Sequence, residues 1–404
     1  MLSQKTIDVI KSTIPALTEH SVALTTLFYT KMFENNPEVK SFFNSSNQAG
    51  GKQQRALAGA IVAFAQNVDN VPALASAVEL ISNKHASLMI KPEHYPIVGS
   101  NLLASIQELL NLPADHDIIT AWGEGYWFLA NVLIEREKEL YAANAKRDGG
   151  WEGFRQFRIT RRVKESSIIT SFYLEPEDGE RLPEYLPGQY ITVRVPTPDG
   201  STTMRNYSLS DVSSTQTFRI SVKHEKGTKE SQAPGYVSTY LHTVLEEGGT
   251  IEVGPPCGEF VLDTDIPSTK PLVFLAGGIG ITPLMSMVGT TLAKNPDRAI
   301  AFVHACLNEE VQAFRSTLDK MEKQYPNLTL RHRYALEQAS ETNSKCASQG
   351  LVDANFLENI VDDRDAHYFI CGPDGFMTAM TNILKNWNIP PAQIRLETFG
   401  PNLG

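Results

Sequence analysis

The spacing of apolar residues divides the chain into three parts, of which the first is helical. At residues 6–14, 56–68 and 97–110, apolar side chains recur every three or four positions. This is the spacing of residues on one face of an α-helix. The first 145 or so residues are almost wholly of this kind, so we expect an all-α domain over residues 1–146.

The second part has the pattern of β-strands. Around residues 144–151 the chain becomes polar and glycine-rich, and from Phe157 onward apolar and polar residues alternate, as at 190–195 and 218–223. Strict alternation is typical of strands with one buried face. Proline and glycine turn pairs separate these strands at short intervals. This pattern predicts an antiparallel β-barrel or sandwich over residues 147–266.

The third part has the pattern of an α/β domain. After Pro271, wholly apolar runs are separated by helical segments at 284–292 and 311–325. Continuous apolar strands are typical of a parallel sheet that is covered on both faces. We expect residues 267–404 to form a doubly wound α/β domain, which gives a multidomain chain of all-α, antiparallel β and α/β parts.

Charge and composition narrow the classes of function. The chain has 36 Lys and Arg against 46 Asp and Glu, a net charge of -10. Nucleic acids and anionic membranes attract basic surfaces, so neither is an expected partner. The first residues lack the pattern of a secretory signal, and the uncharged stretch at 271–288 contains glycines and an internal proline. We expect a cytoplasmic protein without integral membrane association, whose four cysteines are free thiols because none lies in a CxxC pair.

A glycine turn in the third part predicts a nucleotide site. Residues 272–276 form a buried-strand sequence, Gly277, Gly278 and Gly280 follow, and Thr282 with Pro283 can begin a helix. Such a turn brings the backbone of a helix N-terminus close to a pyrophosphate. Many α/β domains use glycine at this turn without binding a ligand, so the turn alone is weak evidence for a nucleotide site. A second apolar run, at 368–373, strengthens the prediction. We expect this run to be a last strand of the same sheet, with its carboxyl end at the ligand-binding edge. The predicted nucleotide contacts are Gly278, Ile279, Gly280, Ile281, Thr282 and Pro283.

The β-rich part carries a second ligand motif. Arg205 can pair with a phosphate, Tyr207 can stack on a flavin ring, and Ser208 can hydrogen-bond the edge of that ring. With Tyr190, these residues resemble the flavin-binding sequences of the ferredoxin reductase superfamily. A surface arginine on a strand is the alternative for Arg205. The same resemblance implies a pyrophosphate-binding helix with Val237 and Ser238 at its amino end. It also implies a carboxyl-terminal segment in which Phe399 covers the flavin ring and Glu397 tunes the flavin electrostatically.

Two acids bear on the choice between nicotinamide cofactors. Glu309 and Glu310 follow the apolar strand at 299–304, near the expected position of the adenosine ribose. Acids at this position favour a free 2′-hydroxyl and repel a 2′-phosphate. This interpretation favours NADH and leaves NADPH possible, although acids also occur at ordinary solvated helix starts.

The helical part contains a candidate haem ligand. A lone histidine on a helix is more often structural than a ligand, but the residues around His85 resemble those of a globin, in which one histidine binds haem iron and a second residue fixes its other nitrogen. Tyr95 and Glu137 are candidates for that second role. A packing tyrosine and a solvated acid are the alternatives. Lys84 lies next to the candidate ligand and could contact a haem propionate or the flavin.

Together, the three parts resemble one known arrangement, the flavohaemoglobins, over essentially the whole chain. The resemblance implies a globin domain with haem b, a β-barrel domain with FAD and an α/β domain for NADH, with NADPH possible. It implies the iron ligand His85, distal catalytic residues Tyr29 and Gln53, and proximal catalytic residues Tyr95 and Glu137. The implied cofactor-binding residues are Lys84, Tyr190, Arg205, Asn206, Tyr207, Ser208, Val237, Ser238, residues 278–283, Glu397, Thr398, Phe399, Gly400 and Pro401. Asn206 and Thr398 stand where relatives vary.

The resemblance also implies an activity. Two NO and two O2, with one NAD(P)H, would give two nitrates, and electrons would pass from NAD(P)H through FAD to haem. Tyr29 and Gln53 would donate hydrogen bonds to the gas ligand, whereas Glu137 and Tyr95 would make His85 electron-rich. We expect a monomer whose partners are NO, O2 and NAD(P)H. Two alternative functions remain open. One is a gas sensor whose reductase resets the iron, and the other is a reductase for another acceptor, such as ferric chelates or quinones.

Overall fold

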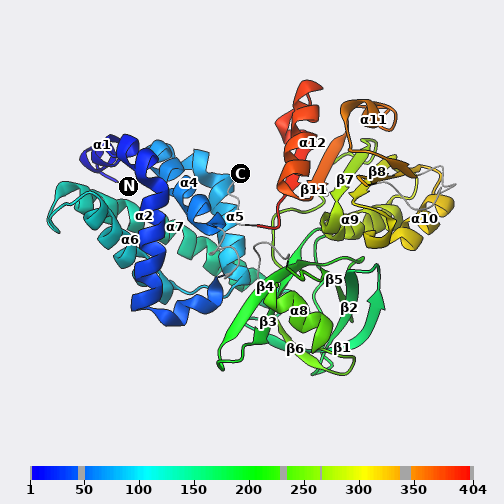
Figure 1. Cartoon of the computed structure of the whole chain (residues 1–404), viewed down its shortest axis with the longest axis horizontal. Coiled ribbons are helices and arrows are strands. Elements are labelled where there is room, and N and C mark those ends of the chain that lie inside the picture. Colours follow the sequence, from blue (N-terminus) through cyan, green and yellow to red (C-terminus); the bar gives the residue numbers. More distant parts are fainter. Residues whose placement is uncertain (1, 44–50, 228–233, 264–265, 337–346, 401–404) are drawn as a thin grey trace.

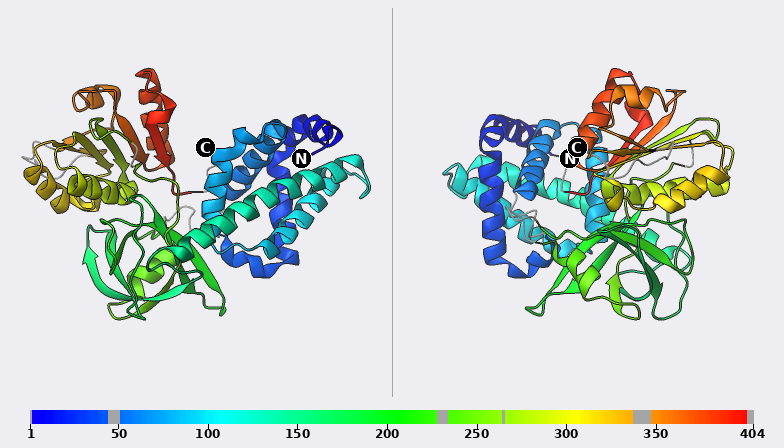
Figure 2. Two further views of the ribbon diagram at one scale, coloured as in Figure 1. Left: turned by 180° about the vertical axis from the view of Figure 1, so that it is seen from behind. Right: turned by 45° about the vertical axis from the view of Figure 1, so that its right-hand side comes forward.

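The chain folds into three lobes that follow one another along the sequence (Figure 1). The computed structural model describes residues 2–43, 51–227, 234–263, 266–336 and 347–400. A helical lobe is joined through its long last helix to a β-barrel, and an α/β lobe packs on the barrel (Figure 2). The described carboxyl-terminal segment, whose last residue is Gly400, leaves the α/β lobe and runs toward the helical lobe (Figure 1).

The first lobe packs its helices around an aromatic and aliphatic core. Phe28, Phe64, Leu102, Ile106 and Trp122 are buried there together. Burial of such side chains stabilises the helices, each of which has one apolar face. The elements are α1 (Gln4–Ser12), α2 (Ile14–Asn35), η1 (Pro37–Phe42), α4 (Lys52–Asn67), η2 (Val71–Leu74), α5 (Ala75–Ser87), η3 (Pro92–His94), α6 (Tyr95–Leu109) and α7 (Asp117–Lys146).

The second lobe is an antiparallel barrel rather than a sandwich. Its strand order is β4-β3-β6-β1-β2-β5, and a bridge between Leu209 and Ile220 brings the two ends of this sheet together. Alternate residues such as Ile191, Val193 and Val195 are fully buried in its core. The elements are β1 (Arg155–Lys164), β2 (Ile169–Pro176), β3 (Tyr190–Pro196), β4 (Thr202–Ser208), β5 (Phe218–Lys223), α8 (Tyr236–Thr243) and β6 (Thr250–Val253).

The third lobe is a parallel sheet with helices on both faces. Its order, β10-β9-β8-β7-β11-β12, changes direction between β7 and β11, and ligands bind at the carboxyl ends of strands at such a switch point. The elements are β7 (Leu272–Gly277), η4 (Gly278–Gly280), α9 (Ile281–Lys294), β8 (Ile300–Cys306), η5 (Glu309–Val311), α10 (Arg315–Gln324), β9 (Leu328–Tyr334), β10 (Ala347–Gln349), α11 (Ala354–Glu358), β11 (His367–Cys371), α12 (Asp374–Asn386), η6 (Pro391–Gln393) and β12 (Ile394–Glu397).

Two local expectations were wrong in this lobe. The apolar run at 368–373 is not the last strand, because β12 follows it and pairs with it in parallel. The helical segment expected at 311–325 is instead a short 3-10 turn followed by α10 from Arg315, because Phe314 has a left-handed backbone (φ 58°) that breaks the helix. Among the described residues, no helix is long and apolar enough to cross a membrane.

Candidate functional site

An apolar cavity of about 320 Å³ lies inside the helical lobe. His85, on α5, and Tyr29, on α2, both line it, together with rings and aliphatic side chains of α4, α6 and α7. An apolar cavity that offers a histidine nitrogen as a ligand suits a flat hydrophobic prosthetic group such as haem. The lining residues are Phe28, Tyr29, Met32, Val39, Phe42, Phe43, Leu57, Ala60, Ile61, Phe64, Ile81, His85, Ile90, His94, Tyr95, Val98, Leu102, Trp122, Tyr126, Leu129 and Leu133.

One nitrogen of His85 is fixed by two partners and the other is left for a ligand. Nδ1 lies 2.7 Å from Oε1 of Glu137 and 3.1 Å from the hydroxyl of Tyr95. The Tyr95 hydroxyl donates to the same carboxylate oxygen at 2.5 Å, and Glu137 is only 2% exposed. Burial and the Glu137 carboxylate raise the pKa of Tyr95. The tautomer with a proton on Nδ1 leaves the Nε2 lone pair free to bind iron.

Tyr29 lines the same cavity as the predicted ligand, and both Tyr29 and Gln53 line the cavity that adjoins it. Tyr29 packs edge-on against Phe28 and Phe43, and burial raises its pKa, so its hydroxyl stays protonated and able to donate. Gln53, near the start of α4, lines the adjoining cavity, and its buried Oε1 has no partner among the described residues. Tyr29 thus brings a polar group to the mainly apolar first cavity, and Gln53 brings one to the second.

A second cavity of about 400 Å³ joins the first to the barrel. The two share Tyr29, Phe42, Phe43, Leu57, Ile81 and His85. The sequence-predicted residues Lys84, Tyr190, Arg205, Asn206, Ser208, Glu397, Thr398, Phe399 and Gly400 all line the second cavity. Pro401 lies outside the described residues. The space is therefore continuous from the predicted iron ligand to the predicted flavin motif.

A lysine and two carboxylates form the charged group of this second cavity. Removal from bulk water lowers the pKa of Lys84, an effect opposed by Glu397 and Glu259. Burial raises the pKa of Glu397 to about 7, with Lys84 opposing and Glu259 adding to the shift. Burial also raises the pKa of Glu259. The Lys84 ammonium in addition lies 5.4 Å from the centre of the Tyr190 ring, so one charged side chain touches both lobes.

Strand β4 presents its motif residues in two directions. Arg205 is half-buried, forms no ion pair with a described residue, and donates to the carbonyl of Met204 at 2.5 Å. Burial lowers its pKa, so an anionic group such as a phosphate would complement it. Tyr207, by contrast, packs against the barrel core and is not among the cavity-lining residues. Its stacking on a flavin stays a prediction.

The predicted pyrophosphate helix of the barrel is α8, with Val237 and Ser238 in its first turn. Both residues are buried. The Ser238 hydroxyl donates to the carbonyl of Gly235 at 2.9 Å and accepts from the backbone N–H of Glu225 at 3.3 Å. Neither side chain lines the second cavity, so their predicted contact would come through the helix N-terminus.

The glycine turn after β7 packs tightly on the end of β11. A Cβ on Gly280 would lie 2.2 Å from the carbonyl oxygen of Cys371, so a side chain there would force the two strands apart. Gly278 has a left-handed backbone (φ 54°) and open space where a side chain would stand. Ile281, Thr282 and Pro283 form the buried first turn of α9, and Ile279 lies within η4. The turn therefore places an open backbone surface at the switch point of the sheet.

The acids near the expected adenosine ribose are not equivalent. Glu309 forms an ion pair with Arg315, which also lies 3.8 Å from Asp319. The carbonyl of Glu310 accepts a backbone hydrogen bond from Ser167 of the barrel at 3.0 Å. Arg315 is thus already neutralised by two carboxylates.

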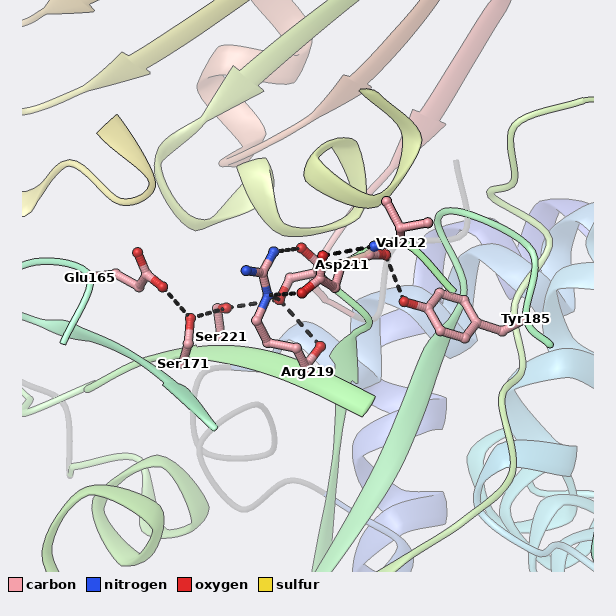
Figure 3. Close-up of polar contacts among 8 residues, drawn as sticks. Glu165, Ser171, Tyr185, Asp211, Val212, Arg219 and Ser221 are labelled. Atoms are coloured by element: carbon pink, nitrogen blue, oxygen red, sulfur yellow. Dashed lines mark hydrogen bonds and ion pairs between the residues drawn. The ribbon is translucent and has the colours of Figure 1, made fainter. Parts of the chain in front are cut away.

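A buried polar network lies where the barrel meets the α/β lobe (Figure 3). Arg219 of β5 is 8% exposed, and its guanidinium carbon lies 5.1 Å from the ring centre of Phe314 in the α/β lobe. Nε of Arg219 lies 3.4 Å from a carboxylate oxygen of Asp211, and Tyr185 donates to the Asp211 carbonyl at 2.6 Å. The arginine therefore contacts both lobes.

Sequence reasoning missed two residues of the junction between the helical lobe and the barrel. Glu259 belongs to the charged group described above, and the Oδ1 of Asn83 accepts from the backbone N–H of Gly258 at 3.1 Å. These partners are 175 positions apart in the chain, so no local pattern announces the contact. The sequence offered one clue to the role of Asn83, namely that it lies two residues before the candidate ligand His85.

Three family models match the chain in the predicted order. Globin matches residues 26–133, the oxidoreductase FAD-binding domain 156–262 and the oxidoreductase NAD-binding domain 274–382. The chain is an NAD(P)H-dependent oxidoreductase that carries a globin, an FAD-binding domain and an NAD-binding domain in one polypeptide. A flavohemoprotein of Rhodopirellula baltica is 45% identical over 404 residues, with 99% of this chain and 98% of that relative covered. The chain belongs to the flavohemoprotein family, which confirms the predicted family and the predicted domain types.

Other similarities span the same length. A flavohemoprotein of Halalkalibacterium halodurans is 42% identical and covers 99% of this chain and 97% of its own length. The crystal structure of a flavohemoglobin from Malassezia yamatoensis, with bound FAD and heme, is 28% identical, with a TM-score of 0.85 and coverage of 99% and 100%. The FAD/NAD-binding part of a nitric oxide dioxygenase from Vibrio cholerae is 31% identical over 63% of this chain and all of that chain, with a TM-score of 0.55.

Proposed function

We propose that this chain is a nitric oxide dioxygenase that removes NO by converting it, with O2, to nitrate at the expense of NAD(P)H. The observation that carries the proposal is the continuous space from His85, in the globin cavity, to the flavin motif on β4. When bound, haem supplies an iron that holds a diatomic gas, and FAD supplies the conversion of a hydride into single electrons. The domains would comprise residues 1–146, 147–266 and 267–404.

The residues of the globin cavity support oxidative chemistry more than simple oxygen storage. Glu137 accepts hydrogen bonds from both His85 and Tyr95, which increases the electron density of the histidine. Tyr29 offers a protonated hydroxyl in the same cavity. A hydrogen bond to a charged acceptor contributes about 1.5–3 kcal/mol, so Tyr29 can stabilise negative charge that develops on a reacting gas.

The barrel and the α/β domain supply groups for anionic cofactors. Arg205 offers a cation without an ion-pair partner among the described residues, and the first turns of α8 and α9 offer backbone N–H groups. Since Arg315 is neutralised by Glu309 and Asp319, it presents little free charge to a 2′-phosphate. We infer that NADH is preferred to NADPH, and a comparison of kcat/KM for the two cofactors tests this inference.

The experiment is NO consumption by the purified, haem- and FAD-loaded protein with NADH in air, with nitrate measured as product. Tyr29→Phe is expected to lower the rate of NO consumption about tenfold or more, because it removes one hydrogen bond to a charged acceptor. His85→Ala is expected to abolish NO consumption while reduction of cytochrome c by NADH continues. Slow or stoichiometric NO loss in the wild type would contradict the proposal and favour a sensor. Unchanged NO consumption in His85→Ala would contradict a role for the globin cavity.

A further inference from the structure

A buried histidine lies directly behind the glycine turn of the α/β domain. His304, on β8, is 1% exposed, and its Nε2 lies 3.1 Å from the carbonyl oxygen of Gly278. Its other nitrogen, Nδ1, is buried without a hydrogen-bond partner among the described residues. His304 is therefore anchored to the turn through one nitrogen only.

The protonation state of His304 follows from this contact. A carbonyl oxygen only accepts, so Nε2 must carry the proton that it donates to Gly278. Burial lowers the pKa of His304 to about 3, and His332 adds to this effect. The ring is thus neutral over the physiological range, and Nδ1 is an acceptor without a donor.

The ring is held in place by its neighbour on β9. The rings of His304 and His332 lie edge to face with their centres 6.5 Å apart. His332 is itself fixed by Gln312 at 2.8 Å and by Asp319 at 3.4 Å. The hydrogen bond to Gly278 is therefore made by a preorganised side chain.

An apolar residue would fit this interior position better than histidine does. An unpaired polar nitrogen in a protein interior is unfavourable, and a leucine or phenylalanine would avoid that cost. The benefit of histidine must then lie in the one hydrogen bond that it makes.

That hydrogen bond fixes the direction of a backbone N–H. The carbonyl of Gly278 also accepts from the N–H of Ile281, at the start of α9, so two donors hold it toward the interior. In a trans peptide, the C=O and the following N–H point in opposite directions. The N–H of Ile279 consequently points away from buried His304 and outward from the turn, as an anion-binding backbone requires.

We propose that His304 is a positioning residue for the pyrophosphate of NADH, which acts by holding the Gly278–Ile279 peptide in the orientation that binds phosphate. This inference rests on the nucleotide site proposed at the same turn. His304 itself does not touch the cofactor.

The test is the affinity of the oxidised, haem- and FAD-loaded protein for NAD+, measured by titration calorimetry, together with the thermal unfolding temperature. NAD+ cannot reduce the flavin, so binding is separated from turnover. His304→Leu is expected to bind NAD+ roughly fivefold to tenfold more weakly, which corresponds to one oriented hydrogen bond. Because the unpaired Nδ1 is removed, its unfolding temperature should stay the same or rise. His304→Gln keeps a donor and is expected to restore most of the affinity.

Two further variants distinguish a failure of the proposed role of His304 from a failure of the nucleotide site itself. His242→Leu removes a comparable bond, from His242 to the carbonyl of Val222 at 3.0 Å, far from the turn and should leave NAD+ affinity unchanged. Gly278→Ala places a side chain on the open face of the turn and should weaken NAD+ binding strongly. Unchanged affinity in His304→Leu with a loss in Gly278→Ala would overturn the role of His304 and leave the site standing. Unchanged affinity in both would overturn the nucleotide site. If His304→Leu does not load FAD, His304→Met replaces it in the same comparison.

Discussion

At the scale of single residues, the predicted iron ligand His85 is hydrogen-bonded to a carboxylate, that of Glu137, which is almost completely shielded from solvent. Glu137 lies on α7, His85 on α5 and Tyr95 at the start of α6. Three helices thus bring one acid, one imidazole and one phenol within hydrogen-bonding distance of each other. The carboxylate charge is held by two donors in a buried place, where its influence on the imidazole is stronger than it would be in water.

Replacing Glu137 by glutamine tests whether its carboxylate affects the electron density of His85. Glu137→Gln keeps the size of the side chain but removes its charge, so the histidine should become a weaker electron donor. We expect NO consumption to fall about tenfold or more, the usual effect of removing a partner of a metal ligand, and the iron–histidine stretching frequency to fall as well. The control is Glu139→Gln, two positions further along the same helix, where the side chain is exposed and paired with Arg136. An unchanged stretching frequency in Glu137→Gln would contradict the prediction.

The pKa of Glu397 gives a second prediction at this scale. A carboxyl whose pKa is raised to about 7 is mostly neutral at pH 6 and mostly ionised at pH 8. Because the pKa of Glu397 is higher in the folded than in the unfolded protein, the folded state becomes less stable as the pH rises from about 4.5 to 7. Ionisation adds negative charge beside the flavin site, faced by Lys84 and Glu259, and disfavours the electron-rich reduced flavin.

We therefore expect the midpoint potential of the flavin to fall more steeply between pH 6 and 8 in the wild type than in Glu397→Gln. The extra fall should be on the order of 30 mV, which for a two-electron couple corresponds to about 1.4 kcal/mol. Redox titrations at pH 6, 7 and 8 provide the measurement. Parallel slopes in the two proteins would contradict an influence of Glu397.

At the scale of elements, helix α5 has two functions that lie on consecutive residues. His85 points into the globin cavity, whereas Asn83, Lys84 and Ser87 contact the barrel. Ser87 accepts a hydrogen bond from Asn206 of β4 at 3.1 Å, and Asn83 accepts one from Gly258. The helix that carries the predicted iron ligand thus also docks the globin on the FAD-binding domain.

Weakening this docking should slow electron transfer from flavin to haem without affecting the earlier step. In Asn83→Ala, the Gly258 N–H loses its acceptor, at a cost of about 1–3 kcal/mol for a buried group. We expect stopped-flow reduction of haem to slow severalfold while reduction of FAD by NADH keeps its rate. Asn101→Ala, which removes bonds to Asn35 and Asn36 within the globin, should change neither step. Equal rates of haem reduction in Asn83→Ala and wild type would exclude a role for this contact.

The elements themselves were largely predictable, because their signals are local. Apolar spacing identified α4 and α6, alternation identified β3 and β5, and the glycine turn identified the junction of β7 and α9. The break at Phe314 was not predictable from apolar spacing, which is the same in a helix and in a short turn followed by a helix. The family resemblance supplied the candidates Tyr95 and Glu137 as partners of His85, but not Glu259, whose partners come from distant parts of the chain.

At the scale of the whole molecule, the contact between the barrel and the α/β domain includes a buried charge, that of Arg219. Arg219 bridges Asp211 and Phe314, while buried serines continue the network along the barrel. Ser221 lies 2.7 Å from Ser171, which donates to Glu165 at the same distance. Polar contacts of this kind fix an orientation more sharply than apolar packing does.

Removing this charge should loosen the orientation of the NAD-binding domain over the flavin. Arg219→Leu is expected to lower the rate of FAD reduction by NADH severalfold and to change the primary isotope effect with 4-deuterated NADH, because hydride transfer depends on close approach of the two rings. Arg158→Leu, on an exposed part of the barrel and paired with Glu177, is the control. A slower reduction with an unchanged isotope effect would point to general destabilisation instead.

The cavity that runs from the globin to the flavin motif has a consequence for how the protein behaves in different media. A reductase and an acceptor that are separate molecules must meet by diffusion, and salt screens the charges that guide them. In the proposed arrangement, donor and acceptor are bound by domains of one chain, and α5, which carries His85 and contacts the barrel, fixes how these domains are placed. Once the cofactors are loaded, the transfer of each electron becomes a first-order event that is independent of protein concentration and nearly indifferent to ionic strength. A cell could therefore keep this chemistry running at very low copy number.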